Sequence, residues 1–269
     1  MKTNINIFTL ASLLFMLFLS LFRPIGFISY LLAALLTLAL VIAFTRVGEG
    51  GPALRDIAAA VRLKREGLRL TLLLAFPTVL IIFAVSYLTS LLLGVFGAEP
   101  AAVPNAPLPN MLLEYALIPA LSEETVFRLL PLVLLAPYSK RWAIILSAAV
   151  FALVHCDFFQ MPYAFVAGLL LMTLDVMTGS VIPSLLIHLI NNAASVVWIK
   201  YCTEPVAVTV FLLALIIPAV ISLVILCARR RRYLPALAEA LSRGECELSP
   251  TPLLLAAVAV ISAIANITI

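Results

Sequence analysis

The sequence predicts an all-α, polytopic transmembrane helical bundle with eight or nine spans. Of its 269 residues, 64% are hydrophobic and 11% are charged, and the mean hydropathy is +1.20. A soluble domain has about 45–50% apolar and about 25% charged residues. Apolar stretches close to the roughly 20 residues that cross a bilayer recur along the chain. We therefore expect a single integral membrane domain over residues 1–269, with no soluble domain and no nucleic-acid partner.

Eight apolar stretches and a weaker ninth are the predicted spans. Arg23-Pro24 follows the first stretch, with no small-residue cleavage site, so we interpret that stretch as a span and not as a signal peptide. The ninth is short and rich in Ala and Val, which leaves the count at eight or nine. The stretches are 7–22, 25–45, 70–96, 111–136, 142–158, 160–177, 181–198, 205–228 and 252–269.

The segments between the spans differ in character. Residues 46–69 are basic and amphipathic, and we expect them to lie along the membrane surface, with a solvated loop-helix as the alternative. Residues 97–110 hold four prolines, which predicts an irregular loop. Residues 233–241 predict a short amphipathic helix.

Basic residues favour a cytoplasmic N-terminus. With nine spans, 14 of the 17 Lys and Arg residues fall on the inner side, whereas only Arg23 and Lys200 fall outside and Arg128 lies within a span. Positive residues collect on the cytoplasmic side of membrane proteins. We expect an integral protein of the bacterial plasma membrane.

Three ionisable residues lie within six positions of the fourth predicted span. Glu123, Glu124 and Arg128 interrupt an apolar segment, where each charge costs about 2.5–3.5 kcal/mol by insertion scales. Glu124 and Arg128 are spaced i,i+4 with the acid first, the favourable order for an ion pair. Glu123 lies about 100° away around the helix and stays available for chemistry. Pro119 and Pro131 bracket the motif and predict kinks. The alternative is a Glu124–Arg128 pair that only fixes helix packing.

The chain has only two histidines, and both lie in apolar segments. His155 follows Phe151 by four residues, and His188 shares a helical face with Asn192 and Ser184. Lipid cannot satisfy these side chains, so we expect them to face the bundle interior or a wet cavity. Asn191 is the alternative to Asn192 as the amide that faces the interior, although it lies one residue away from the helical face of His188. We expect Asp157 and Asp175 at the membrane interfaces.

This set of side chains suits hydrolysis of an amide within the membrane. A carboxylate beside a His can take a proton from water, and burial shifts the pKa values of such groups toward neutral pH. A further His and Asn can stabilise an oxyanion. The alternative for each histidine is a hydrogen bond between helices.

Three short motifs follow one another on successive predicted helices. They are Glu123-Glu124-x-x-x-Arg128, Phe151-x-x-x-His155 and His188-x-x-x-Asn192. Together they resemble the CAAX-protease and bacteriocin-processing family, which includes type II CAAX prenyl endopeptidases and lysostaphin-resistance-protein-A-like bacterial proteins. The resemblance covers 110–199, the predicted catalytic core. Leu129 stands where family members often have Gly, which bears on local packing.

The resemblance implies an intramembrane endopeptidase acting on a peptide or protein substrate, which can be lipidated. It implies that Glu123 and His155 activate water, that His188 and Asn192 hold the oxyanion, and that Glu124 and Arg128 support the motif. We expect no cofactor. Zinc bound by Glu123, His155 and His188 is the alternative, although no HExxH motif is present.

Two functions from other classes compete with a protease. One is a non-catalytic membrane immunity or scaffold protein of the same fold. The other is a proton-coupled transporter with a buried Glu–His relay, which predicts inverted repeats that we do not find in this sequence.

Overall fold

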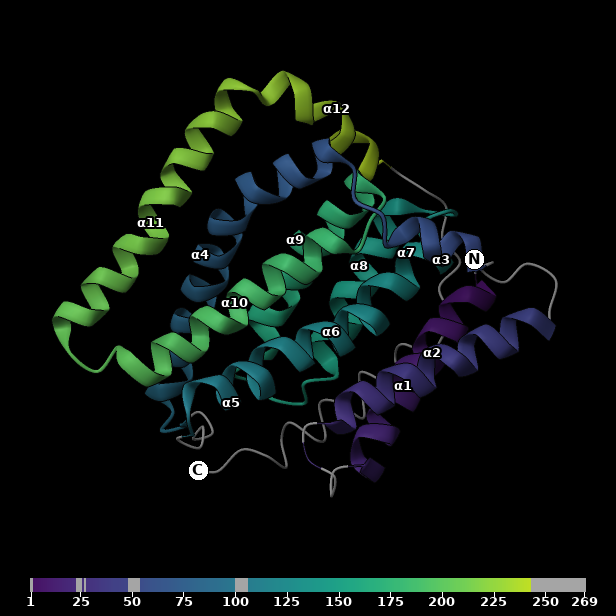
Figure 1. Ribbon diagram of the computed structural model, residues 1–269, viewed down its shortest axis with the longest axis horizontal. Coiled ribbons are helices and arrows are strands. Elements are labelled where there is room, and N and C mark those ends of the chain that lie inside the picture. The colour runs from purple at the N-terminus through teal and green to yellow at the C-terminus, as the bar shows by residue number, and fades with distance from the viewer. Residues whose placement is uncertain (1, 23–25, 27, 48–53, 100–105, 243–269) are drawn as a thin grey trace.

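The computed structural model describes residues 2–22, 26, 28–47, 54–99 and 106–242 (Figure 1). None of these residues forms a β-strand, so the predicted all-α class is confirmed for them. The predicted ninth span, 252–269, lies outside the described residues. The elements are α1 (Lys2–Phe22), α2 (Ile28–Val47), α3 (Leu54–Ala60), α4 (Arg65–Val95), α5 (Leu108–Leu112), η2 (Leu113–Leu117), α6 (Ile118–Glu124), η3 (Thr125–Leu129), α7 (Leu130–Leu134), α8 (Lys140–Leu153), α9 (Met161–Thr178), α10 (Ile182–Tyr201), α11 (Pro205–Ala228) and α12 (Arg230–Ala240).

Five described helices are long and apolar enough to cross a membrane, namely α1, α4, α9, α10 and α11. The apolar part of α2, Ile28–Ala43, is shorter than that, and α8 has 14 residues because the chain leaves the helix before His155. The polytopic character is therefore confirmed, whereas the predicted eight or nine spans are not. Within the basic segment 46–69, α3 spans Leu54–Ala60 and α4 begins at Arg65, so the helix of the third predicted span starts before Leu70.

The acidic motif lies on a helical segment, 108–134, that we call the motif helix. It comprises α5, η2, α6, η3 and α7, and η2 and η3 are π-helical. A helical proline clashes with the carbonyl four residues earlier. For Pro119 and Pro131 those carbonyls belong to Tyr115 and Phe127, the central residues of η2 and η3. The wider π turn accommodates the rings, so the predicted kinks take the form of two π-segments.

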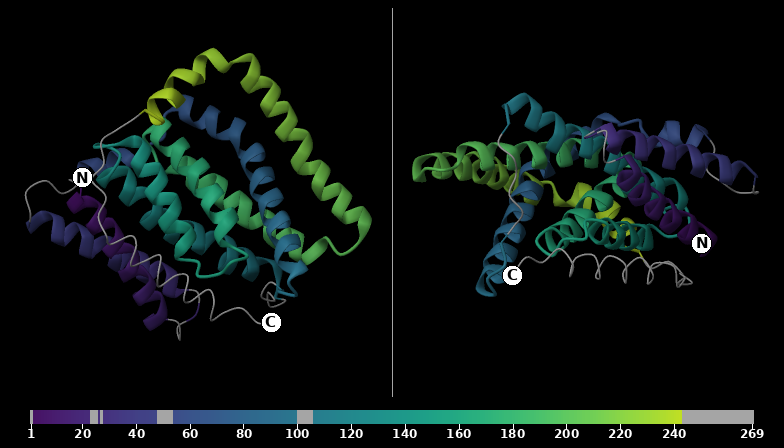
Figure 2. Two further views of the ribbon diagram at one scale, coloured as in Figure 1. Left: turned by 180° about the vertical axis from the view of Figure 1, so that it is seen from behind. Right: turned by 90° about the horizontal axis from the view of Figure 1, so that it is seen from below.

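The helix α10 runs through the middle of the bundle and contacts the motif helix, α4 and α9 (Figure 1). The α1–α2 pair lies at one side, and α11 packs along α4 at the other side, as the views from behind and below also show (Figure 2). One buried apolar cluster joins α1, α2, η3, α7, α8 and α9, and a second joins α4, α9, α10 and α11. The polar motifs lie where α8 and α10 meet the motif helix.

Small residues set the approach of the helices behind the site. A Cβ atom on Gly168 of α9 would lie 2.6 Å from the Cα atom of Ala148 on α8, so the two helix backbones touch here. Gly179 has a φ of +66° at the end of α9, where its N–H bonds the carbonyl of Asp175 at 2.7 Å. This left-handed glycine ends α9 and lets α10 begin three residues later.

Candidate active site

His188 on α10 lies between the two glutamates of the motif helix. Its Nδ1 is 2.7 Å from Oε1 of Glu124, and its Nε2 is 3.8 Å from Oε2 of Glu123. The side chain of Glu123 is 15% exposed and that of Glu124 is 2% exposed. Because Glu124 accepts the Nδ1 proton, the Nε2 atom of His188 is the one available for chemistry.

The predicted pair of Glu124 and Arg128 is present and fully buried. Nε of Arg128 lies 3.5 Å from Oε2 of Glu124, and the arginine side chain is 0% exposed. Nη1 of Arg128 donates to the Phe127 carbonyl at 3.1 Å. Arg128 therefore holds Glu124, and Glu124 holds His188, in one connected set.

The Phe127 carbonyl explains how the motif helix tolerates Pro131. Proline has no N–H to bond the carbonyl four residues before it, and in a membrane such a carbonyl needs another donor. Besides Arg128, the buried hydroxyl of Ser147 on α8 donates to this oxygen. A serine from a neighbouring helix thus ties α8 to the acidic motif.

The ring of Phe151 on α8 contacts three members of the site. The guanidinium Cζ of Arg128 lies 4.3 Å from the ring centroid, an arrangement typical of a cation–π contact. The imidazole rings of His155 and His188 meet the same ring edge-to-face, at 4.8 Å and 5.9 Å between centroids. Phe151 therefore spaces the two histidines as well as covering the arginine.

His155 lies just beyond the end of α8, which ends at Leu153. The predicted span 142–158 was therefore too long at this end. The next residue, Cys156, has a φ of +49°, a left-handed backbone that non-glycine residues seldom adopt. Nδ1 of His155 lies 2.7 Å from the Phe151 carbonyl. Because a carbonyl only accepts, Nδ1 carries the proton, and the neutral ring presents an Nε2 lone pair.

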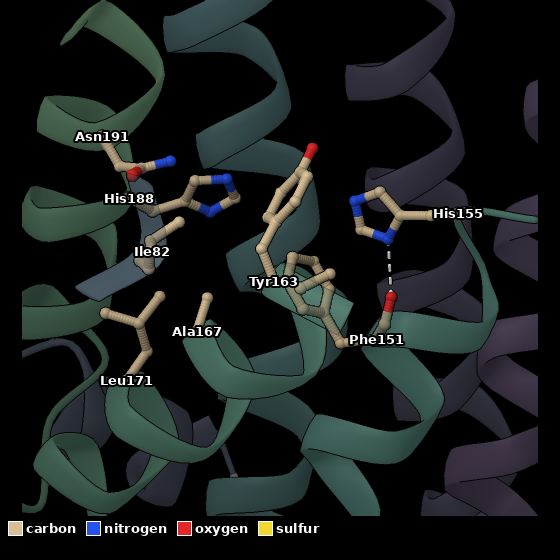
Figure 3. Close-up of a pocket in the computed structure, with 9 residues that line it drawn as sticks. Ile82, Phe151, His155, Tyr163, Ala167, Leu171, His188 and Asn191 are labelled. Atoms are coloured by element: carbon tan, nitrogen blue, oxygen red, sulfur yellow. Dashed lines mark hydrogen bonds between the residues drawn. The ribbon is translucent and has the colours of Figure 1, made fainter. Parts of the chain in front are cut away.

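Both histidines line one small cavity of about 30 Å³. Its walls include Phe151, Tyr163, Ala167 and Asn191. Figure 3 shows the imidazole of His188 on α10 and that of His155, from the turn after α8, on either side of the Tyr163 ring. A polar cavity needs about 10–15 Å³ to hold a water molecule, so there is room for one or two. Both predicted histidines therefore line one space that can hold one or two water molecules.

The amide that lines this cavity is Asn191, not the predicted Asn192. Asn191 is buried, and its Oδ1 has no hydrogen-bond partner among the described residues. Its Nδ2 lies 3.3 Å from Oδ1 of Asn192, which is only partly buried. The rotation of α10 thus favours the alternative amide, with Asn192 as its neighbour.

Asp175, which was expected at a membrane interface, is buried inside the protein and 0% exposed. Its Oδ1 accepts the backbone N–H of Ser184 at 3.1 Å, and Ser184 lies in the first turn of α10. The first N–H groups of a helix lack helical partners, so Asp175 caps the helix that carries His188. The only signal in the sequence is the tight Gly179-Ser180 turn between two apolar stretches.

A three-ligand metal site is not present among the described residues, since no group of three His, Cys, Asp or Glu side chains converges. Nδ1 of His188 is taken by Glu124, and Nδ1 of His155 by a backbone carbonyl. These bonds leave both Nε2 atoms free, as in metal-binding histidines. The zinc set is disfavoured only because Glu123, His155 and His188 do not converge on one point among the described residues.

Comparison with known proteins places this region in a family context. Residues 105–194 match the family model described as Rce1-like type II CAAX prenyl endopeptidase, which confirms the predicted resemblance. The match covers 90 of the 269 residues, one third of the chain, and includes both glutamates, both histidines and both asparagines of the site. No curated protein and no solved structure matches the chain. At the level of the family, the match supports a membrane-embedded peptidase with a peptide substrate.

Proposed function

We propose that this protein is an intramembrane endopeptidase in which Glu123 and His155 activate water for attack on a peptide bond. The observation that carries the proposal is the placement of His155 and His188 on one water-sized cavity, with Glu123 beside His188. The family match over residues 105–194 supports the same reaction class.

The first step is transfer of a proton from water. The neutral tautomer of His155 offers its Nε2 lone pair to a water in the cavity. We assign the sharing of that proton to the carboxylate of Glu123, which lies 3.8 Å from Nε2 of His188. The resulting hydroxide attacks the carbonyl carbon, and the π electrons of the carbonyl move to its oxygen.

The second step is stabilisation of the oxyanion. Donation from Nε2 of His188 requires the imidazolium form, because the Nδ1 proton is already bonded to Glu124. Glu124, itself paired with Arg128, compensates that charge. We assign the second donor to the amide pair of Asn191 and Asn192, of which Asn191 lines the cavity. Collapse of the intermediate breaks the C–N bond, and the proton held by His155 or Glu123 passes to the leaving amine.

This mechanism uses no metal, and we propose it in preference to the zinc alternative because Glu123, His155 and His188 do not converge on one point among the described residues. The substrate that the family's printed name indicates is a prenylated CAAX peptide. We therefore propose a peptide or protein substrate that carries a lipid. We further propose a bacterial plasma membrane location with the N-terminus in the cytoplasm, on the distribution of basic residues.

The test is cleavage of a farnesylated CAAX peptide by purified protein in detergent, with the unprenylated peptide in parallel. We expect Glu123→Gln and His155→Ala to lower kcat at least about 100-fold, the scale of a lost general acid–base group. The matched control is Glu204→Gln, which changes an exposed carboxylate at the start of α11. Full activity in either site variant would refute the assignment.

The same variants distinguish the competing functions. If the protein is an immunity or scaffold protein, the Glu123→Gln and His155→Ala variants would keep the cellular phenotype. The wild-type protein would then cleave neither of the two peptides. A proton-coupled transporter would instead show flux in proteoliposomes that these substitutions abolish. We expect no flux above that of empty vesicles.

A further inference from the structure

A second and much larger cavity lies beneath α12, with a volume of about 400 Å³. Its walls come from α4, α9 and the end of α11, and α12 bends from α11 back toward the ends of α4 and α9 (Figures 1 and 2). On α9 this cavity is lined by Leu170 and Thr173, whereas Ala167 and Leu171 line the catalytic cavity. The two cavities share no lining residue, and the larger one lies nearer the C-terminal end of α9.

The chemistry of the cavity wall selects an apolar occupant. Leucines supply most of the lining, and the hydroxyl of Thr173 is already bonded to the Leu169 carbonyl at 2.6 Å. Water in such a cavity would find few of the two to four polar partners that it needs. A hydrocarbon chain would make the dispersion contacts that an empty space lacks.

The roof of the cavity is an amphipathic helix held in place by ion pairs. Arg230, Tyr233, Leu234, Leu237 and Leu241 line the cavity at the spacing of one helical face. Outside that face, Arg232 pairs with Glu66 at the start of α4, and Glu239 pairs with Lys140 at the start of α8. The helix is thus attached at both sides while its apolar face points to the cavity.

The charge at this end of the cavity selects an anion. Arg230 lines the cavity and is exposed, and among the described residues neither it nor its neighbours Arg229 and Arg231 forms an ion pair. These arginines follow the 24-residue apolar helix α11, so they stand where such a span meets the lipid phosphates. Basic pockets between helices at this level are suited to anionic lipid headgroups.

We infer that this cavity binds one anionic phospholipid, with an acyl chain under α12 and the phosphate against Arg230. The inference does not depend on peptidase activity. Binding would fasten α12 onto α9, the helix that also lines the catalytic cavity.

The experiment is native mass spectrometry of the full chain, released from detergent containing either phosphatidylglycerol or phosphatidylcholine with identical acyl chains. We expect one phosphatidylglycerol per protein at concentrations where phosphatidylcholine does not bind. Arg230→Gln should weaken the adduct about fivefold, since a basic residue near the surface contributes about 1 kcal/mol. The matched control, Arg141→Gln, removes an exposed charge from the first turn of α8, outside the cavity, and should leave binding unchanged.

A second variant tests the acyl site separately from the charge. Leu237→Trp fills the cavity and should abolish the phosphatidylglycerol adduct. The more exposed Leu234→Trp serves the same purpose if Leu237→Trp fails to fold. Three results would each overturn the inference. They are equal binding of both lipids, unchanged phosphatidylglycerol binding in Arg230→Gln, and displacement of the lipid by inorganic phosphate alone. Displacement by the farnesylated peptide would also overturn it, because the cavity would then belong to the substrate path.

Discussion

The hydroxyl of Ser147 on α8 donates a hydrogen bond to the carbonyl of Phe127 on the motif helix, the carbonyl that Pro131 cannot bond. The arrangement couples the helix that leads to His155 with the helix that carries Glu123 and Glu124. Its contribution can be measured because each partner can be changed separately.

Ser147→Ala is expected to lower the free energy of unfolding by about 1 kcal/mol, because Phe127 keeps only its bond from Arg128. In a Pro131→Ala background the restored backbone N–H can bond that carbonyl, so the same serine substitution should cost less. Thermal unfolding in detergent of the two single variants and the double variant measures the difference. Equal costs in both backgrounds would show that the bond has no such role.

Glu124→Gln is expected to destabilise the fold by about 3–5 kcal/mol, because it leaves the buried Arg128 without a counter-charge. Glu124→Gln combined with Arg128→Met should recover much of that stability while peptide cleavage stays low, since His188 still lacks its carboxylate. Unfolding and cleavage are measured on the same preparations. A double variant no more stable than the single one would contradict the pairing.

Phe151→Leu removes the ring that contacts Arg128 and both histidines. We expect a loss of about 1–3 kcal/mol in stability, from the cation–π contact and the smaller side chain. We also expect a fall in kcat that exceeds any change in KM, because the ring spaces the imidazoles. Phe165→Leu, at a side chain 37% exposed on α9, is the control and should change neither quantity appreciably.

Gly168→Ala should destabilise the protein by about 1–3 kcal/mol, because the added methyl overlaps the backbone of Ala148 and forces α8 and α9 apart. Gly94 lies in α4 with no atom within 4 Å of an added Cβ, so Gly94→Ala should stabilise by about 0.5–1 kcal/mol. The opposite signs are measured by thermal unfolding. The same sign for both substitutions would argue against the close approach of α8 and α9.

The ion pair between Lys140 and Glu239 should make the attachment of α12 dependent on pH. The hydrogen bond from Lys140, together with its charge, lowers the pKa of Glu239 below its ordinary value. The pair therefore contributes stability above that ordinary value and loses it as the pH falls through the lowered pKa. Wild type should unfold at a higher temperature than Glu239→Gln near neutral pH, and the two should converge in acid. If the difference in unfolding temperature between wild type and Glu239→Gln persists in acid, it comes from packing and not from the ion pair.

Much of the fold and of the site follows from the order and spacing of residues along single helices. Glu124 and Arg128 pair as their i,i+4 spacing predicts, and the apolar stretches mark the helices. Such features depend on distances within one element, so the chain's own geometry sets them.

Only the tertiary structure decided which side chains face the cavity. It turned Asn191 inward instead of Asn192, buried Asp175 against the start of α10, and ended α8 before His155. The rotation and depth of each helix depend on contacts between elements, such as Gly168 against Ala148 and the left-handed turn at Gly179. A one-residue change of facing turns a side chain by about 100°, and the pattern along a uniformly apolar helix is too weak to specify that angle.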